Sequence, residues 1–184
     1  MLIPLFLRLD RKRVLVVGGG TIAERKAIDL ADAGADVTVV APEVTDALAM
    51  DARIKIERRA FEESDVDGAW LVFAATDDPV TQVRACDAAD LAHVFAVAVD
   101  DPPNGSAYSA SVIRRGPFTV AISSSGEAPA LSRLLREVLE QALPEEDWLE
   151  SARALRERWR RDGTPMTSRF AELVRSFKDR ASGG

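Results

Sequence analysis

Short apolar runs alternate with helix-like stretches over the first part of the chain. Uninterrupted apolar runs of a few residues are typical of strands that are buried on both faces of a parallel sheet. The first helix-like stretch ends at Gly34, a residue type that commonly stops helices. This rhythm predicts an α/β fold, a doubly wound parallel sheet in the order 3-2-1-4-5 with helices on both faces. The predicted strands are residues 14–17, 37–40, 54–56, 70–75 and 94–99, and the predicted helices are residues 22–33, 42–50 and 79–90.

The rhythm changes after residue 101. Two short apolar segments flank a turn at residues 114–117, and a helix is predicted from Pro129 to residue 143, where apolar side chains recur at spacings of three and four. Two further amphipathic helices are predicted at residues 146–161 and 166–180. We therefore divide the chain into an α/β domain, a central segment and a small C-terminal helical domain, at residues 1–112, 113–144 and 145–184.

Composition narrows the class of protein. The chain of 184 residues has a net charge of -6, which argues against a general nucleic-acid partner. The acidic excess lies in residues 1–112, whereas residues 113–184 are slightly basic. A single Cys and a single His exclude a disulfide framework and the Cys-rich and His-rich metal sites, so we expect no resident metal. No apolar run approaches the ~18 residues of a membrane span, and no signal-peptide pattern is present, so we expect a cytoplasmic protein without a membrane partner.

A glycine-rich loop follows the first predicted strand. Gly18, Gly19, Gly20, Thr21 and Ile22 lead into Ala23, which completes the pattern G-x-G-x-x-A where a strand gives way to a helix. In Rossmann folds the first glycine permits the tight turn, and the second lets the backbone approach a pyrophosphate, which the helix amides then bind. We predict that these residues bind a dinucleotide cofactor. The alternative is a glycine-rich turn that binds nothing.

The rest of the cofactor site is expected at the carboxyl ends of the other strands. Ala41, Pro42 and Glu43 follow the second strand, and only Glu43 is able to hold a ribose 2′-hydroxyl. No Lys or Arg follows that strand closely, which favours NAD over NADP. Thr76 follows the fourth strand and is predicted to line the cofactor cleft, while a capping role remains open for the aspartates beside it.

Several motifs in order resemble the precorrin-2 dehydrogenase / sirohydrochlorin ferrochelatase family, which includes the N-terminal module of siroheme synthase. The resemblance covers residues 2 to about 144. It rests on residues 4–7, 16–26, 74–78, 99–101, 115–117, 121–131 and 133–137.

The resemblance implies NAD-dependent oxidation of precorrin-2 to sirohydrochlorin and, in some members, Fe²⁺ insertion to give siroheme. It also implies that residues 113–144 form the dimerisation segment of a homodimer. The family's key carboxylate maps onto Asp100, and a family serine, phosphorylated in some members, maps onto Ser124. The sequence departs from the family at Val97, where Asn is usual, and at residues 107–110.

The tetrapyrrole carries eight carboxylates, so cationic side chains are needed to bind it. We expect Arg114 and Arg115 to contribute, together with Ser124 near the start of the following helix. The alternatives are solvated arginines, a helix-capping serine and, for Asp100, a turn residue. The rival function for the whole chain is a non-catalytic, NAD-sensing regulatory module, which needs the glycine loop but not Asp100.

Overall fold

The computed structural model describes residues 2–116, 118–143 and 146–181. Contacts divide the chain into two compact units. The first unit comprises Met1–Ala110 and Ser123–Pro129, and the second comprises Ser111–Ile122 and Ala130–Gly184. The segment that contains Ser124 therefore belongs with the α/β part of the chain.

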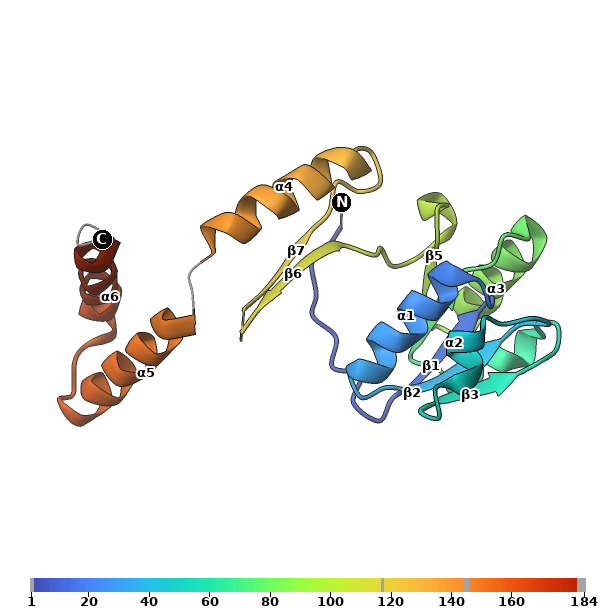
Figure 1. The fold of residues 1–184 in the computed structure, drawn as a ribbon, viewed down its shortest axis with the longest axis horizontal. Helices are drawn as coiled ribbons and strands as arrows, with labels where there is room; N and C mark the ends of the chain where they lie inside the picture. The colour runs from blue at the N-terminus through green and yellow to red at the C-terminus, as the bar shows by residue number, and fades with distance from the viewer. Residues whose placement is uncertain (1, 117, 144–145, 182–184) are drawn as a thin grey trace. The chain divides into compact units, whose positions relative to one another are not determined.

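The first unit contains a five-stranded parallel sheet in the order β3-β2-β1-β4-β5, of which Figure 1 labels β1, β2, β3 and β5. This confirms the predicted fold class and strand order. The order reverses beside β1, so a crevice for a ligand is expected at the carboxyl ends of the strands there. The strands are β1 Arg13–Val17, β2 Asp36–Val40, β3 Ile54–Glu57, β4 Leu71–Ala74 and β5 Phe95–Ala98.

The helices of the first unit follow the predicted pattern with one clear difference at α2. This helix begins at Asp46 rather than at Pro42, because the Thr45 side chain caps it by accepting from the Leu48 amide. The 3₁₀ helices η1 and η2 were not predicted. The elements are α1 Thr21–Asp32, α2 Asp46–Met50, η1 Glu63–Val66, α3 Pro79–Leu91 and η2 Pro102–Asn104.

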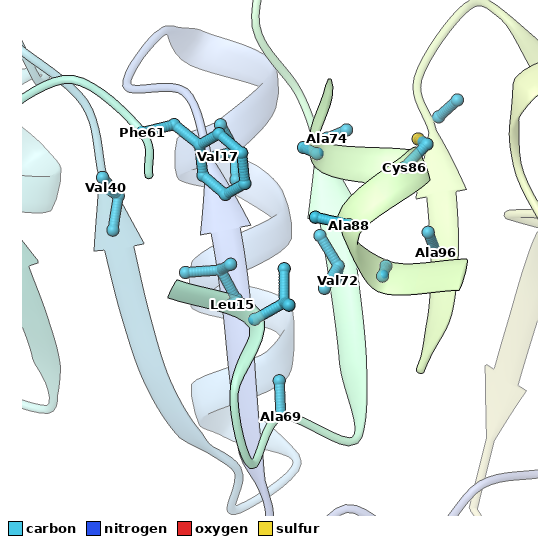
Figure 2. Close-up of a cluster of buried hydrophobic side chains, with 14 residues drawn as sticks. Leu15, Val17, Val40, Phe61, Ala69, Val72, Ala74, Cys86, Ala88 and Ala96 are labelled. Atoms are coloured by element: carbon cyan, nitrogen blue, oxygen red, sulfur yellow. The ribbon is translucent and has the colours of Figure 1, made fainter. Parts of the chain in front are cut away.

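Both faces of the sheet are buried, as the continuous apolar strands predict. Val14 and Val16 of β1 pack with α1 and α2 on one face. Leu15 and Val17 point to the other face, where they join a cluster with Phe61 and the inner side of α3 (Figure 2). The strands that end at the carboxyl edge of the sheet are therefore held in place by buried clusters on both faces.

The open edge of β5 is covered by the chain that leaves it. The Ala107 amide donates to the Ala96 carbonyl at 2.9 Å, and the Ser106 hydroxyl accepts from the Ala96 amide at 2.9 Å. A methyl group at Gly105 would lie 3.0 Å from the Ala96 oxygen, so glycine allows this close approach. The segment after Asp100 is thereby held against the sheet.

The second unit contains an antiparallel strand pair and three helices. Arg115 donates to the Leu143 carbonyl at 2.7 Å, and the buried Trp159 donates to Glu172 at 2.6 Å, which joins α5 to α6. Over the described residues, no helix is long and apolar enough to cross a membrane. The elements are β6 Ser111–Arg115, β7 Phe118–Ile122, α4 Pro129–Ala142, α5 Glu146–Arg161 and α6 Met166–Ala181, with Pro129 itself in the first unit.

Candidate cofactor and active site

Gly18 and Gly19 are required by the packing of the loop itself. Gly18 has a φ of 119°, and a methyl group there would lie 2.2 Å from the carbonyl oxygen of Ala75. A methyl group at Gly19 would lie 1.9 Å from the carbonyl oxygen of Glu43. The loop is thus wedged between the chain that follows β4 and the chain that follows β2. The tight turn predicted at Gly18 is present.

Gly20 faces open space instead. A Cβ atom there would meet no protein atom within 4 Å among the described residues. Gly20 is also the N-cap of α1, and no side chain caps that helix. The first amides of a helix have no partner within it and attract anions. The loop therefore offers an uncovered backbone and free helix amides, starting at Thr21 and Ile22, which fits a pyrophosphate.

The end of β2 lies directly beside the loop. The Gly18 amide donates to the Val40 carbonyl at 3.0 Å, and the Thr45 amide donates to the Gly19 carbonyl at 3.0 Å. Between these bonds, Ala41 is buried, whereas the side chains of Pro42 and Glu43 are exposed. Glu43 thus lies directly beside the glycine loop, where Rossmann folds place a ribose anchor.

The residues after β4 also line this part of the crevice. One of the aspartates there, Asp78, caps a helix. Thr76 is half-buried, and its hydroxyl accepts from the Asp78 amide at 3.2 Å. Asp78 caps α3 by accepting from the Thr81 hydroxyl and from the Val80 and Thr81 amides. These bonds, led by that of the Thr81 hydroxyl, lower the pKa of the Asp78 carboxyl. The capping interpretation therefore holds for Asp78.

Asp100 follows β5 at the same edge of the sheet. Its side chain is exposed, and its backbone is left-handed, with a φ of 60°. Its neighbour Asp101 accepts from the Asn104 side chain at 2.5 Å and begins η2, whereas the Asp100 carboxylate has no hydrogen bond or ion pair within the part of the chain that the structure describes. The two adjacent aspartates therefore differ, and only Asp100 presents an uncommitted carboxylate.

Ser124 lies in the first unit with Asp100. Its hydroxyl accepts from the Ala128 amide at 3.1 Å, a bond within the loop that ends where α4 begins at Pro129. The loop also approaches η2, because a methyl group at Gly126 would lie 3.2 Å from Pro102. Arg114 and Arg115 belong to the second unit. Arg114 is exposed, and Arg115 donates to Leu143 as described above.

Gln82 was not singled out from the sequence. It is 7% exposed and lies in the first turns of α3, where its side chain donates to the Ala74 carbonyl at 3.2 Å and to the Val99 carbonyl at 2.8 Å. One available signal was its spacing, since it precedes the buried Ala85, Cys86 and Ala89 by three, four and seven residues. A polar residue on an apolar helix stripe needs a partner.

A doubly wound sheet whose first strand enters an uncapped helix through a glycine turn defines a dinucleotide-binding protein of the Rossmann class. The chain belongs to the family described as putative NAD(P)-binding, whose model matches residues 5–111. The model described as sirohaem biosynthesis protein central matches residues 115–142. Both findings agree with the resemblance stated from the sequence.

Curated relatives with similar sequences are siroheme synthases. "Siroheme synthase 3" of Aeromonas hydrophila is 51% identical over 146 residues, and "Siroheme synthase 1" of Aeromonas salmonicida is 49% identical over 146 residues. Each alignment covers 78% of this chain but 31% of the relative, so the chain spans about a third of their length. "Siroheme synthase" of Escherichia coli O157:H7 is 44% identical and covers 77% of this chain and 32% of the relative.

A solved structure shares the fold. "SirC, precorrin-2 dehydrogenase" superposes with a TM-score of 0.73 and 23% sequence identity, and the match covers 95% of this chain and 88% of that chain. At this identity the match shows the fold, including the helical second unit.

Proposed function

We propose that this protein is an NAD-dependent dehydrogenase that oxidises precorrin-2 to sirohydrochlorin in siroheme biosynthesis. The names of the relatives and of the structural neighbour support this activity. The observation that carries it is the position of Asp100. Its exposed carboxylate, which has no partner among the described residues, follows β5 at the edge of the sheet where the glycine loop follows β1.

The cofactor is held by the carboxyl edge of the sheet. The amides that follow Gly20 bind the pyrophosphate, and Gly18 and Gly19 shape the turn. Glu43 accepts from the ribose hydroxyls, and its negative charge disfavours a 2′-phosphate, so the cofactor is NAD. Thr76 lines the crevice at the end of β4. NAD held by these residues would supply the hydride acceptor for the oxidation.

Asp100 handles the proton that accompanies hydride loss from precorrin-2. A carboxylate without a competing partner is free to accept a proton from a substrate carbon or nitrogen. It also holds the tetrapyrrole in register beside the cofactor. Ser124, Arg114 and Arg115 bind substrate carboxylates. Homodimer formation and a cytoplasmic location remain predictions from the sequence.

Fe²⁺ enters this proposal as a substrate and not as a resident cofactor. Over the described residues, no three His, Cys, Asp or Glu side chains are grouped to hold a metal ion. Iron insertion would require removal of pyrrole protons, for which Asp100 is the available base. Adding Fe²⁺ to the sirohydrochlorin product tests this step, because siroheme has a different absorption spectrum.

The test of the dehydrogenase activity is a spectroscopic assay with precorrin-2 and NAD. We expect the wild-type protein to form sirohydrochlorin and Asp100→Asn to lose about a hundredfold or more of that turnover. The affinity for NAD should stay within about twofold, because Asp100 takes no part in the glycine loop.

Asp101→Asn is the matched control. It removes the same charge one residue away, and an asparagine oxygen still accepts from Asn104. We expect it to keep most of the turnover. Full activity of Asp100→Asn would contradict the assigned role. A wild-type protein that binds NAD but forms no sirohydrochlorin would instead favour the NAD-sensing module.

A further inference from the structure

The buried amide of Gln82 joins the ends of two neighbouring strands. Ala74 is the last residue of β4, and Val99 directly follows β5. The Ala74 carbonyl also accepts from the Val99 amide at 3.0 Å, which continues the sheet by one bond. The Gln82 side-chain amide donates one proton to this Ala74 carbonyl and the other to the Val99 carbonyl at 2.8 Å. The side chain thus fixes the point at which the chain leaves the sheet.

The Val99 carbonyl belongs to the peptide group that leads into Asp100. A peptide group is planar, so a bond that fixes its carbonyl also fixes its N–H and the direction of the next Cα atom. Asp100 then adopts a φ of 60°, in the left-handed region that few residues with a side chain occupy. Since the Asp100 carboxylate has no bond of its own in the described chain, its direction depends on this backbone.

Gln82 is itself held rigidly. Its backbone amide donates to the Asp78 carbonyl at 3.0 Å, and Asp78 caps the same helix with its side chain. One turn further along α3, Cys86 packs in the apolar cluster that includes Ala74 and Ala96 (Figure 2), and Ala89 belongs to the same cluster. A buried glutamine between two carbonyls is fully used as a donor, and an apolar residue of equal length would leave the Val99 carbonyl without this bond.

We propose that Gln82 is a positioning residue, which sets the left-handed conformation of Asp100 through the Val99 carbonyl and so aims the carboxylate into the active site. This inference rests on the proposed function, in which Asp100 acts on the substrate. Gln82 itself is 7% exposed and its amide is bonded to two carbonyls, so it acts through the backbone of Val99.

The test compares Gln82→Met, Gln82→Glu and Cys86→Ala with the wild type in the full-length protein. Methionine keeps the length of the side chain but donates nothing, and glutamate keeps its shape while placing acceptors against two carbonyls. We expect kcat to fall about tenfold or more in both variants, with KM for NAD changed less than about twofold. Cys86→Ala removes packing in the same helix and should lower the melting temperature while preserving kcat.

A second measurement does not depend on turnover. The ¹³Cα and ¹³Cβ chemical shifts of Asp100 report its backbone conformation. They should leave the left-handed range in Gln82→Met and Gln82→Glu and stay unchanged in Cys86→Ala. Unchanged Asp100 shifts in a folded Gln82 variant would overturn the inference, whatever the substrate. Should Gln82→Met not fold, the isosteric Gln82→Glu decides.

The kinetic outcome separates this inference from the proposed function. A normal kcat in a folded Gln82 variant, with wild-type turnover intact, would refute the inference and leave the proposed function standing.

Discussion

Three adjacent glycines in the loop after β1 are required for different physical reasons. Gly18 has a left-handed φ and no room for a side chain, and a Cβ atom at Gly19 would collide with the Glu43 carbonyl. Gly20 has an ordinary negative φ and open space around its Cβ position. The first two glycines therefore serve the fold, while the third leaves room for a ligand.

Gly20→Ala separates cofactor binding from folding. The added methyl group meets no protein atom, so the melting temperature should stay within about 2 °C of the wild-type value. The same group lies where the pyrophosphate approaches the backbone, so the affinity for NAD should fall at least about tenfold. Calorimetric titration and thermal denaturation measure the two effects.

Gly19→Ala is the opposite control. It places a methyl group 1.9 Å from a backbone oxygen and should lower the melting temperature clearly. A Gly20→Ala variant that binds NAD as the wild type does would mean that the pyrophosphate does not lie over this residue.

Single residues were predictable where a motif carries its own physical reason. The turn at Gly18 follows from the spacing of the glycines alone, and a turn-capping role was left open for Asp77 and Asp78, of which Asp78 has it. Gln82 was missed because its two partners lie 8 and 17 residues away, at the ends of separate strands. No local pattern reveals such partners.

At the scale of elements, η1 is held by one ionic cluster. The Arg59 guanidinium donates to both carboxylate oxygens of Asp65, at 2.5 and 2.8 Å, and the Glu62 amide donates to the same side chain at 2.9 Å. The Asp65 side chain is only 9% exposed. The Arg59 bond, followed by the Glu62 amide, holds the pKa of Asp65 below its ordinary value despite burial.

This cluster should make stability depend on pH. Because the folded-state pKa of Asp65 is lower than its unfolded value near ~3.9, the cluster stabilises the fold above that pH. The contribution is lost as the pH falls through the folded-state pKa. We expect Asp65→Asn to reduce the free energy of unfolding by about 1–3 kcal/mol near neutral pH and by much less near pH ~2.

Denaturant titrations at the two pH values measure this difference. Glu63→Gln is a suitable control, because its ion pair with Arg84 is exposed and should contribute no measurable stability. An equal loss at both pH values in Asp65→Asn would show that the carboxylate charge is not the cause.

The strands and long helices were predictable because each is specified by a continuous local pattern. The apolar runs of β1, β2, β4 and β5 and the strand order followed from alternation alone. The start of α2 was placed four residues too early, since Thr45 and not Pro42 supplies the cap. The helices η1 and η2 are too short to have a period, and η1 depends on Arg59 from outside the element.

At the scale of the whole molecule, the sequence suggested three consecutive segments, but the contacts interleave them. Residues 123–129 lie in the first unit, although β7 before them and most of α4 after them belong to the second. The close approach of Gly126 to Pro102 joins positions that are distant in the sequence. Such nonlocal contacts leave no trace in hydrophobic periodicity.

The second unit carries an apolar helix face that suits a second copy of the chain. Five large apolar side chains of α4 are between 39% and 55% exposed, although helical spacing places them on one side. Contiguous exposed apolar surface of this kind marks an association site, and a two-fold axis lets one patch cover its own copy. The residues are Leu131, Leu134, Leu135, Val138 and Leu139.

Val138→Asp should therefore convert the predicted homodimer into a monomer. An aspartate in the middle of this face would be buried without a partner on association, at a cost of several kcal/mol. Sedimentation equilibrium should give twice the chain mass of 20.0 kDa for the wild type and the single mass for the variant.

Arg133→Asp is the control, because it introduces the same side chain on the opposite side of α4. That side carries the ion pair with Glu137 and no apolar face, so this variant should remain dimeric. A dimeric Val138→Asp variant, or a monomeric wild type, would show that the α4 face does not join two copies.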